Sequence, residues 1–167
     1  MELWEVLDDK GNPTGDIMQK YDQKVFEQGF YHLGADVWII NSENKILIQK
    51  RAKEKRLEPN VWAMTGGSVI LGENSKNTIV REAKEELNID INVNDLKIIT
   101  KFKTGNVWID TYILKCDYDI SKMKFQEDEV SDAKWATWSE INELVKNNQF
   151  IKNRWEFVSE FLKEEIK

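Results

Sequence analysis

Glutamate residues crowd one short stretch of this chain. Glu82, Glu85 and Glu86 fall within five residues, and Glu73 precedes them, shortly after a pair of glycines. Side chains three and four residues apart share one face of a helix, so these carboxylates would converge and repel one another. Hard cations such as Mg²⁺ prefer oxygen ligands of this kind and are commonly shared with substrate phosphates. The alternative interpretation is a solvated acidic helix face that binds nothing.

A helix over residues 76–87 is predicted to carry these glutamates. Ser75 is the predicted N-cap, and Asn88 can adopt the left-handed conformation that ends a helix. The apolar residues of the segment form one stripe at helical spacing: Ile79, Val80, Ala83 and Leu87. A short strand or extended turn over residues 61–69, containing Gly66 and Gly67, leads into the helix.

The remaining segments predict a mixed sheet. Alternating or apolar runs indicate strands at residues 2–8, 31–40, 45–51, 96–103, 106–117 and 133–138. Further helices are predicted at 139–147 and 150–166, the last with one apolar face that packs on the domain or, alternatively, forms a homodimer contact. Strands and helices do not alternate regularly, so we expect one α+β domain spanning residues 1–167, with helices on both faces of a mixed sheet.

Composition narrows the classes of function. The chain of 167 residues has a net charge of −6 and a pI near 5.0, which argues against a nucleic-acid partner. Its apolar runs are too short to cross a membrane, its first residues do not resemble a signal peptide, and Cys116 is its only cysteine, so we expect a reduced, cytoplasmic protein. The only basic run, residues 49–56, is a solvated loop unless it lies beside the glutamates.

The spacing upstream of the helix argues against a merely solvated face. Gly67 is followed after five residues by Glu73, and after seven more by the segment REAKEELNI, residues 81–89. This pattern resembles the signature of the Nudix hydrolases, G-x5-E-x7-R-E-U-x-E-E-x-G-U, where U is a bulky aliphatic residue. Two positions depart from it: Ala83 is small for U, and Asn88 replaces the closing glycine. Asn also tolerates the left-handed conformation, so the geometry is preserved.

The resemblance implies a Nudix fold and metal-dependent hydrolysis of a diphosphate bond in a small molecule, such as a nucleoside diphosphate linked to another group. Glu85 and Glu86 would be the principal ligands of Mg²⁺, or of Mn²⁺, with Glu82 and the carbonyl of Gly67 joining them. Arg81 would hold the glutamates in place and contact Glu73. Glu82, Glu85, Arg81 and Glu129 form the expected catalytic set. Glu129 is preferred to Glu127 as the catalytic base in a later loop. The alternative is that this loop is solvated and has no catalytic role.

Two residues are candidates for substrate contact. Arg51 ends the strand before the glycine pair and is suited to bidentate phosphate binding. Trp108 is the preferred candidate among seven tryptophans for stacking on a base, although tryptophans on strands mostly belong to the core.

Within the family, residues 2–90 resemble the branch related to isopentenyl diphosphate isomerase. Those isomerases carry a cysteine at the position of Gly66 and a histidine at the position of Ser68. They also carry a pair of histidines; this chain has His32 at one of the two positions and Val25 at the other. The missing groups argue against isomerisation, and His32 is interpreted as structural. A non-catalytic nucleotide sensor is the remaining alternative, although the intact glutamates argue against it.

Overall fold

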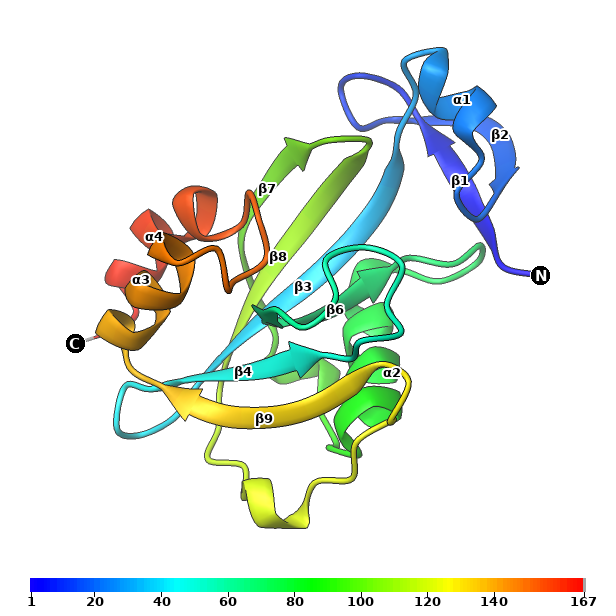
Figure 1. Ribbon diagram of the computed structural model, residues 1–167. Helices are drawn as coiled ribbons and strands as arrows, with labels where there is room; N and C mark the ends of the chain where they lie inside the picture. The colour runs from blue at the N-terminus through cyan, green and yellow to red at the C-terminus, as the bar shows by residue number, and fades with distance from the viewer. Residues whose placement is uncertain (167) are drawn as a thin grey trace.

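The computed structural model describes residues 1–166 and confirms a mixed sheet with helices on its two faces (Figure 1). The strands are β1 (Leu3–Leu7), β2 (Pro13–Gln19), β3 (His32–Ile40), β4 (Ile46–Arg51), β5 (Trp62–Ala63), β6 (Thr65–Ser68), β7 (Lys97–Thr104), β8 (Val107–Lys115) and β9 (Val130–Ala136). The helices are α1 (Gln23–Glu27), α2 (Ser75–Leu87), α3 (Trp138–Lys146) and α4 (Trp155–Lys163), with short 3-10 turns at Val93–Asp95 and Ile120–Lys122. None of the helices within residues 1–166 is both long and apolar enough to cross a membrane.

The large sheet has seven strands, with the order β5-β4-β3-β8-β7, and β6 and β9 pair with β3 and β4 respectively. Its central pair, β3 and β8, is parallel, whereas the other pairs are antiparallel. The predicted strands at residues 31–40 and 45–51 form β3 and β4, which pair with each other at a single position, Ile40 with Ile46. Beyond it β6 takes the place beside β3, which brings the glycine pair to the middle of the sheet.

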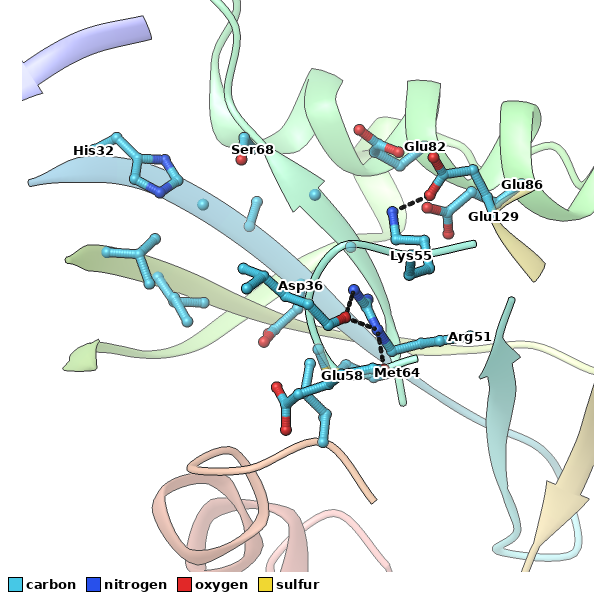
Figure 2. A pocket seen from close by; sticks show the side chains of 18 of the residues that line it. His32, Asp36, Arg51, Lys55, Glu58, Met64, Ser68, Glu82, Glu86 and Glu129 are labelled. Carbon is cyan, nitrogen blue, oxygen red and sulfur yellow. Dashed lines mark hydrogen bonds and ion pairs between the residues drawn. The ribbon is translucent and has the colours of Figure 1, made fainter. Parts of the chain in front are cut away.

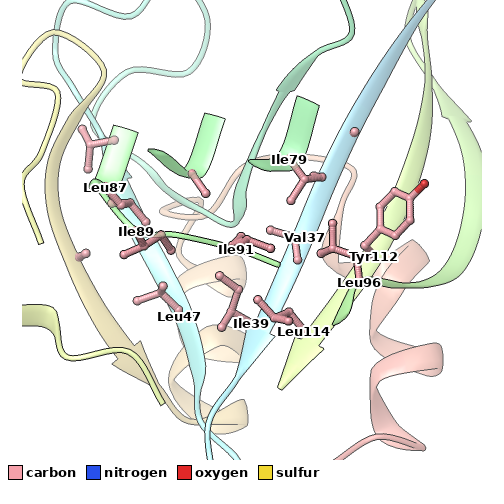
Figure 3. Packing of buried hydrophobic residues seen from close by; sticks show 14 of the residues in the cluster. Val37, Ile39, Leu47, Ile79, Leu87, Ile89, Ile91, Leu96, Tyr112 and Leu114 are labelled. Atoms are coloured by element: carbon pink, nitrogen blue, oxygen red, sulfur yellow. The ribbon is translucent and has the colours of Figure 1, made fainter. Parts of the chain in front are cut away.

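Side chains that alternate along β3 divide the core between the two faces. Val37 and Ile39 pack with the apolar stripe of α2, whereas Trp38 and Ile40 pack with α3 and α4. Figure 3 shows the first cluster, in which Ile79 and Leu87 of α2 lie over β3, β4 and β8. The acidic face of α2 is therefore left to point away from this core.

The ends of α2 are set by two asparagines. Asn74, not the predicted Ser75, is the N-cap, because its side chain accepts a hydrogen bond from the backbone N–H of Asn77 at 2.9 Å. The Ser75 hydroxyl instead lies 2.7 Å from that of Tyr112 on β8. Asn88 ends the helix with φ 55°, which confirms the predicted left-handed cap.

Two elements near the ends of the chain differ from expectation. The sequence predicts no strand at residues 13–19, but they form β2, and together with β1 and α1 they enclose a small cluster of Trp4, Val6 and Met18. β2 is almost wholly exposed, so no alternation marks it in the sequence. The last helix is shorter than predicted, because Asn153 adopts φ 58° and helix α4 begins at Trp155.

Candidate active site

A cavity of about 360 Å³ lies between α2, β3, β6 and the loop at residues 52–61. Four of the carboxylates that line it come from α2 and from the loop before β9: Glu82, Glu85, Glu86 and Glu129. Figure 2 shows Glu82, Glu86 and Glu129 gathered at the α2 side, with Lys55 facing them. The predicted acidic set and part of the basic run at residues 49–56 therefore share one cavity.

Arg81 ties the acidic residues together. Its Nε and Nη2 donate to the two carboxylate oxygens of Glu73 at 2.9 and 3.1 Å, and Nη1 donates to Glu82 at 2.9 Å and Glu85 at 3.3 Å. The Thr78 hydroxyl completes the environment of Glu73 at 2.5 Å. Burial alone would raise the pKa of Glu73, but the hydrogen bonds from Arg81 and Thr78 hold it below its usual value. This carboxylate is fully compensated inside the protein.

The glycine pair lies on β6, where β3 and α2 approach it closely. A Cβ atom at Gly66 would lie 2.4 Å from the backbone carbonyl oxygen of Ala35 on β3. A Cβ atom at Gly67 would lie 2.3 Å from the carboxylate oxygen Oε1 of Glu82. The β3 backbone therefore requires glycine at position 66, whereas a Cβ atom at position 67 would have to displace the carboxylate of Glu82.

Glu86 is the most deeply buried of the helix glutamates. The side-chain amide of Gln49, on β4, donates to Oε2 of Glu86 at 2.6 Å. The Thr65 hydroxyl donates to the side-chain oxygen Oε1 of Gln49 at 2.9 Å and thereby orients the amide. Burial, together with the charges of Glu82 and Glu129, raises the pKa of Glu86 to about 8. Burial likewise raises the pKa of Glu82, although Arg81 opposes it. Within residues 1–166, the ion pair of Glu82 with Arg81 does not offset the effect of burial on Glu82, and Glu86 forms no ion pair.

Glu129 reaches the cavity through strand pairing. Its backbone carbonyl accepts from the N–H of Ala52 at 2.9 Å, at the point where β9 joins β4. The preceding loop is tied to the end of α2 by the bond from Gln126 N–H to the carbonyl of Glu86 at 3.0 Å. The carboxylate of Glu129 forms an ion pair with Lys55. Glu127, the other candidate in this loop, is exposed and does not line the cavity.

Comparisons with known proteins identify the family. The NUDIX domain family matches residues 30–161, most of the chain. This chain belongs to the Nudix hydrolase family. A Nudix hydrolase of Listeria monocytogenes that is itself uncharacterized is 31% identical over 152 residues, covering 90% of this chain and 89% of the relative.

Two further comparisons agree with the predicted branch and fold. An isopentenyl-diphosphate Delta-isomerase of Citrobacter koseri is 27% identical and covers 78% of this chain and 75% of the isomerase. Among solved structures, the protein DR0079 of Deinococcus radiodurans has a similar fold, with a TM-score of 0.72, 21% identity and coverage of 89% of this chain and 91% of that one.

The donor set of this Nudix hydrolase fits a hard divalent cation. Its cavity offers carboxylate oxygens on Glu82, Glu85, Glu86 and Glu129, and Gly67 passes within contact distance of Glu82. In the conformation described for residues 1–166, no three acidic, histidine or cysteine side chains are gathered closely enough to form a finished metal site. Instead, Arg81 forms an ion pair with Glu82, and Lys55 forms one with Glu129. Two buried carboxylates with raised pKa nevertheless need a positive charge, which a cation would supply.

Arg51 lines the cavity as predicted for a substrate contact, but part of its guanidinium is already engaged. Its Nε donates to the carbonyl of Glu58 at 3.0 Å and its Nη2 to that of Leu57 at 2.8 Å. Arg51 therefore shapes the loop at residues 52–61, which also carries Lys55. These contacts follow from the loop conformation and leave no signal in the sequence.

Trp108 does not line the cavity, so the structure gives no support to the prediction that it stacks on a substrate base. Its neighbours on β8, Val107 and Ile109, face the cavity, and strand alternation turns Trp108 to the other side. There its ring packs beside Gly11, within 3.1 Å of the place where a Cβ atom would stand.

His32 and Gly66 stand at two positions where the resemblance implies a histidine and a cysteine in the isomerases, so His32 is shared with them and Gly66 is not. The His32 ring stacks on Trp4 with centroids 3.9 Å apart, and burial lowers its pKa to about 4. A cysteine at position 66 would place its Cβ against the β3 backbone, as described above for Gly66. Stacking and burial agree with the structural interpretation of His32, although the ring also borders the cavity.

Sequence reasoning missed four residues that shape the site: Gln49, Lys55, Asp36 and Arg154. Gln49 and Lys55 lie in or beside the basic run that drew attention, but neither has a distinctive type or spacing. Asp36 offered one usable signal, because it is a single charged residue inside the apolar run YHLGADVWII. Arg154, in the last turn before α4, offered none.

Proposed function

We propose that this Nudix hydrolase cleaves a diphosphate bond in a small molecule, such as a nucleoside diphosphate linked to another group, with Mg²⁺ or alternatively Mn²⁺ as cofactor. The observation that carries the proposal is the pair of buried, incompletely compensated carboxylates, Glu82 and Glu86, in a cavity that also presents Arg51 and Lys55. Glu82, Glu85, Glu86 and the carbonyl of Gly67 would hold the cation. When bound, that cation supplies charge neutralisation and polarises the phosphate.

The protein's own groups divide the remaining work. Arg81 keeps Glu82 and Glu85 in place by its hydrogen bonds, and Gln49 does the same for Glu86. Arg51 and Lys55 would contact the phosphate oxygens that face the basic loop. As Lys55 turns to the phosphate, Glu129 is freed to accept the proton of the attacking water. The oxygen of that water bonds to one phosphorus, the bridging P–O bond breaks, and a monophosphate leaves.

Two other functions make different predictions. An isomerase related to the Citrobacter koseri protein would convert isopentenyl diphosphate without releasing phosphate, but this cavity has Gly66 where the isomerase cysteine is expected. A sensor would bind one nucleotide tightly and turn over none. The uncompensated glutamates favour hydrolysis over both, because neither carbon chemistry at a missing cysteine nor simple binding requires them.

The test is a panel of diphosphate compounds, including ADP-ribose, nucleotide sugars, dinucleotides and isopentenyl diphosphate, assayed for phosphate and monophosphate release during Mg²⁺ and Mn²⁺ titration. For a compound that is turned over, Glu86→Gln and Glu85→Gln should lower kcat by more than about a hundredfold, since even residues behind the ligands of a metal cost 10–100-fold. Glu143→Gln, which removes an exposed carboxylate from α3, is the matched control and should leave kcat unchanged. Wild-type rates in the two α2 variants would refute the assignment.

A further inference from the structure

Arg154 and Asp36 form a buried charge pair at the end of the cavity away from the glutamates. Asp36 lies on β3 and is 2% exposed, and Arg154, just before α4, has a side chain that is 17% exposed. Both line the cavity, and Arg154 Nε lies 3.9 Å from Asp36 Oδ2. In Figure 2, Asp36 and Glu58 lie apart from Glu82 and Glu86. The pair therefore belongs to a different part of the cavity from the proposed cation site.

The pair leaves hydrogen-bonding capacity unused. Within residues 1–166, neither Arg154 Nε nor either carboxylate oxygen of Asp36 has a hydrogen-bond partner, and Arg154 Nη1 makes only a long contact of 3.5 Å to the Asn153 carbonyl. A guanidinium offers five donors in a planar fork. Arg81, by contrast, spends its donors on three carboxylates. Asp36 therefore places a carboxylate beside Arg154 without accepting a hydrogen bond from its guanidinium group.

The surroundings of Arg154 favour an anion. Burial lowers the pKa of Arg154, and the charge of Arg51 acts in the same direction, while Asp36, Glu58 and Glu156 oppose them. Glu58 is already engaged, since its carboxylate accepts the backbone N–H of Lys152 at 2.8 Å. This end of the cavity is therefore bordered by two carboxylates, Asp36 and Glu58, and by the guanidinium groups of Arg51 and Arg154, which repel each other. An oxyanion would relieve their repulsion, whereas a neutral hydroxyl would not.

We propose that Arg154 is a specificity residue that binds a second oxyanion, a carboxylate or a phosphate, on the part of the substrate beyond the diphosphate that is cleaved. The inference rests on the proposed function for the identity of that diphosphate. Asp36 acts as a positioning residue that holds the fork toward the cavity. Met64 and Ile151, which also line the cavity, offer apolar contact to the carbon atoms between the two anionic groups.

The test measures binding and not turnover. The probes are methylene-bridged diphosphonates, which resist hydrolysis, carrying carbon arms of increasing length that end in a hydroxyl, a carboxylate or a phosphate. Isothermal titration calorimetry in the presence of Mg²⁺ gives their Kd values for the full chain. Wild-type protein should prefer an acid-ended arm over the matched hydroxyl arm by about tenfold or more, the usual effect of a charge-assisted hydrogen bond. Comparison of the carboxylate and phosphate arms identifies the anion.

Three variants isolate the role of Arg154. Arg154→Met should abolish the preference for the acid-ended arm while leaving the Kd of the hydroxyl arm within about threefold, and Arg154→Lys should keep only part of it because the fork is lost. Lys152→Met removes the same charge from an exposed neighbour and should keep the full preference. Since Arg154→Met leaves Asp36 without a counter-ion, the double variant with Asp36→Asn serves if the single variant fails to fold.

Two results would overturn the inference. One is a wild-type protein without preference for any acid-ended arm, including the case in which only the diphosphonate group contributes to binding. The other is an equal loss for acid-ended and hydroxyl arms in Arg154→Met, which would place Arg154 at the cleaved diphosphate or in the framework of the fold. Failure of the proposed function looks different: no compound is hydrolysed, yet the preference for the acid-ended arm is present and depends on Arg154.

Discussion

Replacement of Arg81 by methionine removes the charge that holds three carboxylates while keeping a similar side-chain length. The lost contacts are the two-pronged pair with Glu73 and single hydrogen bonds to Glu82 and Glu85. Glu73 keeps its hydrogen bond from Thr78, whereas Glu82 keeps no neighbouring cation. The variant therefore leaves like charges close together on one side of α2.

The size of the loss follows from burial. The side chains of Glu73 and Glu82 are 14% and 16% exposed, and that of Arg81 is 26% exposed. Removing one partner of a buried pair costs about 3–5 kcal/mol, and the partial exposure of these groups reduces that figure. The contact with Glu85, which is 51% exposed, adds little. We expect Arg81→Met to lower the free energy of unfolding by about 3 kcal/mol at pH 7.

The cost should also depend on pH in one direction. Against the effect of burial, Arg81 and Thr78 hold the pKa of Glu73 below its usual value. A depressed carboxyl pKa contributes stability that is present above the unfolded value of about 4.3 and is lost as the pH falls through the folded value. The difference between wild type and Arg81→Met should therefore be greatest near pH 7 and shrink below about pH 4.

Urea unfolding followed by tryptophan fluorescence, in EDTA at pH 7 and at pH 3.5, measures both effects. Lys84→Met is the matched control, because it removes a cation from the same helix whose partner, Asp90, is largely exposed, and it should cost less than about 1 kcal/mol. A cost below about 1 kcal/mol for Arg81→Met at pH 7, or the same larger cost at both pH values, would refute the reasoning.

Three further predictions concern single positions. Gly66→Ala should prevent stable folding, because its Cβ atom would lie 2.4 Å from a backbone carbonyl oxygen. Gly67→Ala should fold but weaken Mg²⁺-dependent activity, because its Cβ atom would lie 2.3 Å from the movable carboxylate of Glu82. Thermal unfolding tests the first effect, and activity assays test the second. Gln49→Leu removes the hydrogen bond from the Gln49 amide to the carboxylate of Glu86, so kcat should fall about 10–100-fold, with an altered Mg²⁺ dependence in the same assay. Asn88→Gly should keep or slightly raise the Tm, and Asn88→Ala should lower it, because φ is 55°.

The parts of the site that sequence reasoning predicted are the local ones. Helix α2, its left-handed cap at Asn88 and the common face of its glutamates depend on spacing within a few residues. The glycine pair was singled out by its distance from Glu73, and the structure supplies the steric reason. Such features can be predicted from the sequence because they depend on residues within a single element.

The parts that escaped prediction depend on pairing between distant segments. Glu129 and Lys55 meet because β9 pairs with β4, and Gln49 meets Glu86 because β4 lies beside α2. The position of Trp108 outside the cavity was equally hard to predict, because alternation along β8 gives two faces without saying which one borders the cavity. These contacts follow from the sheet order, which strand patterns alone do not determine.

The two kinds of carboxylate in this protein show how stability and function are separated. Glu73 is met by a guanidinium and a hydroxyl, and its pKa is lowered, so its charge stabilises the fold. Glu86 is buried with a neutral amide as its hydrogen-bond partner, and its pKa is raised to about 8, so its charge costs stability at neutral pH. A chain selected for stability alone would place an apolar residue or an arginine there. The retained cost is explained if a cation binds at Glu86 during function, and for that reason Glu86, and not the salt-bridged Glu73, identifies the reactive part of the cavity.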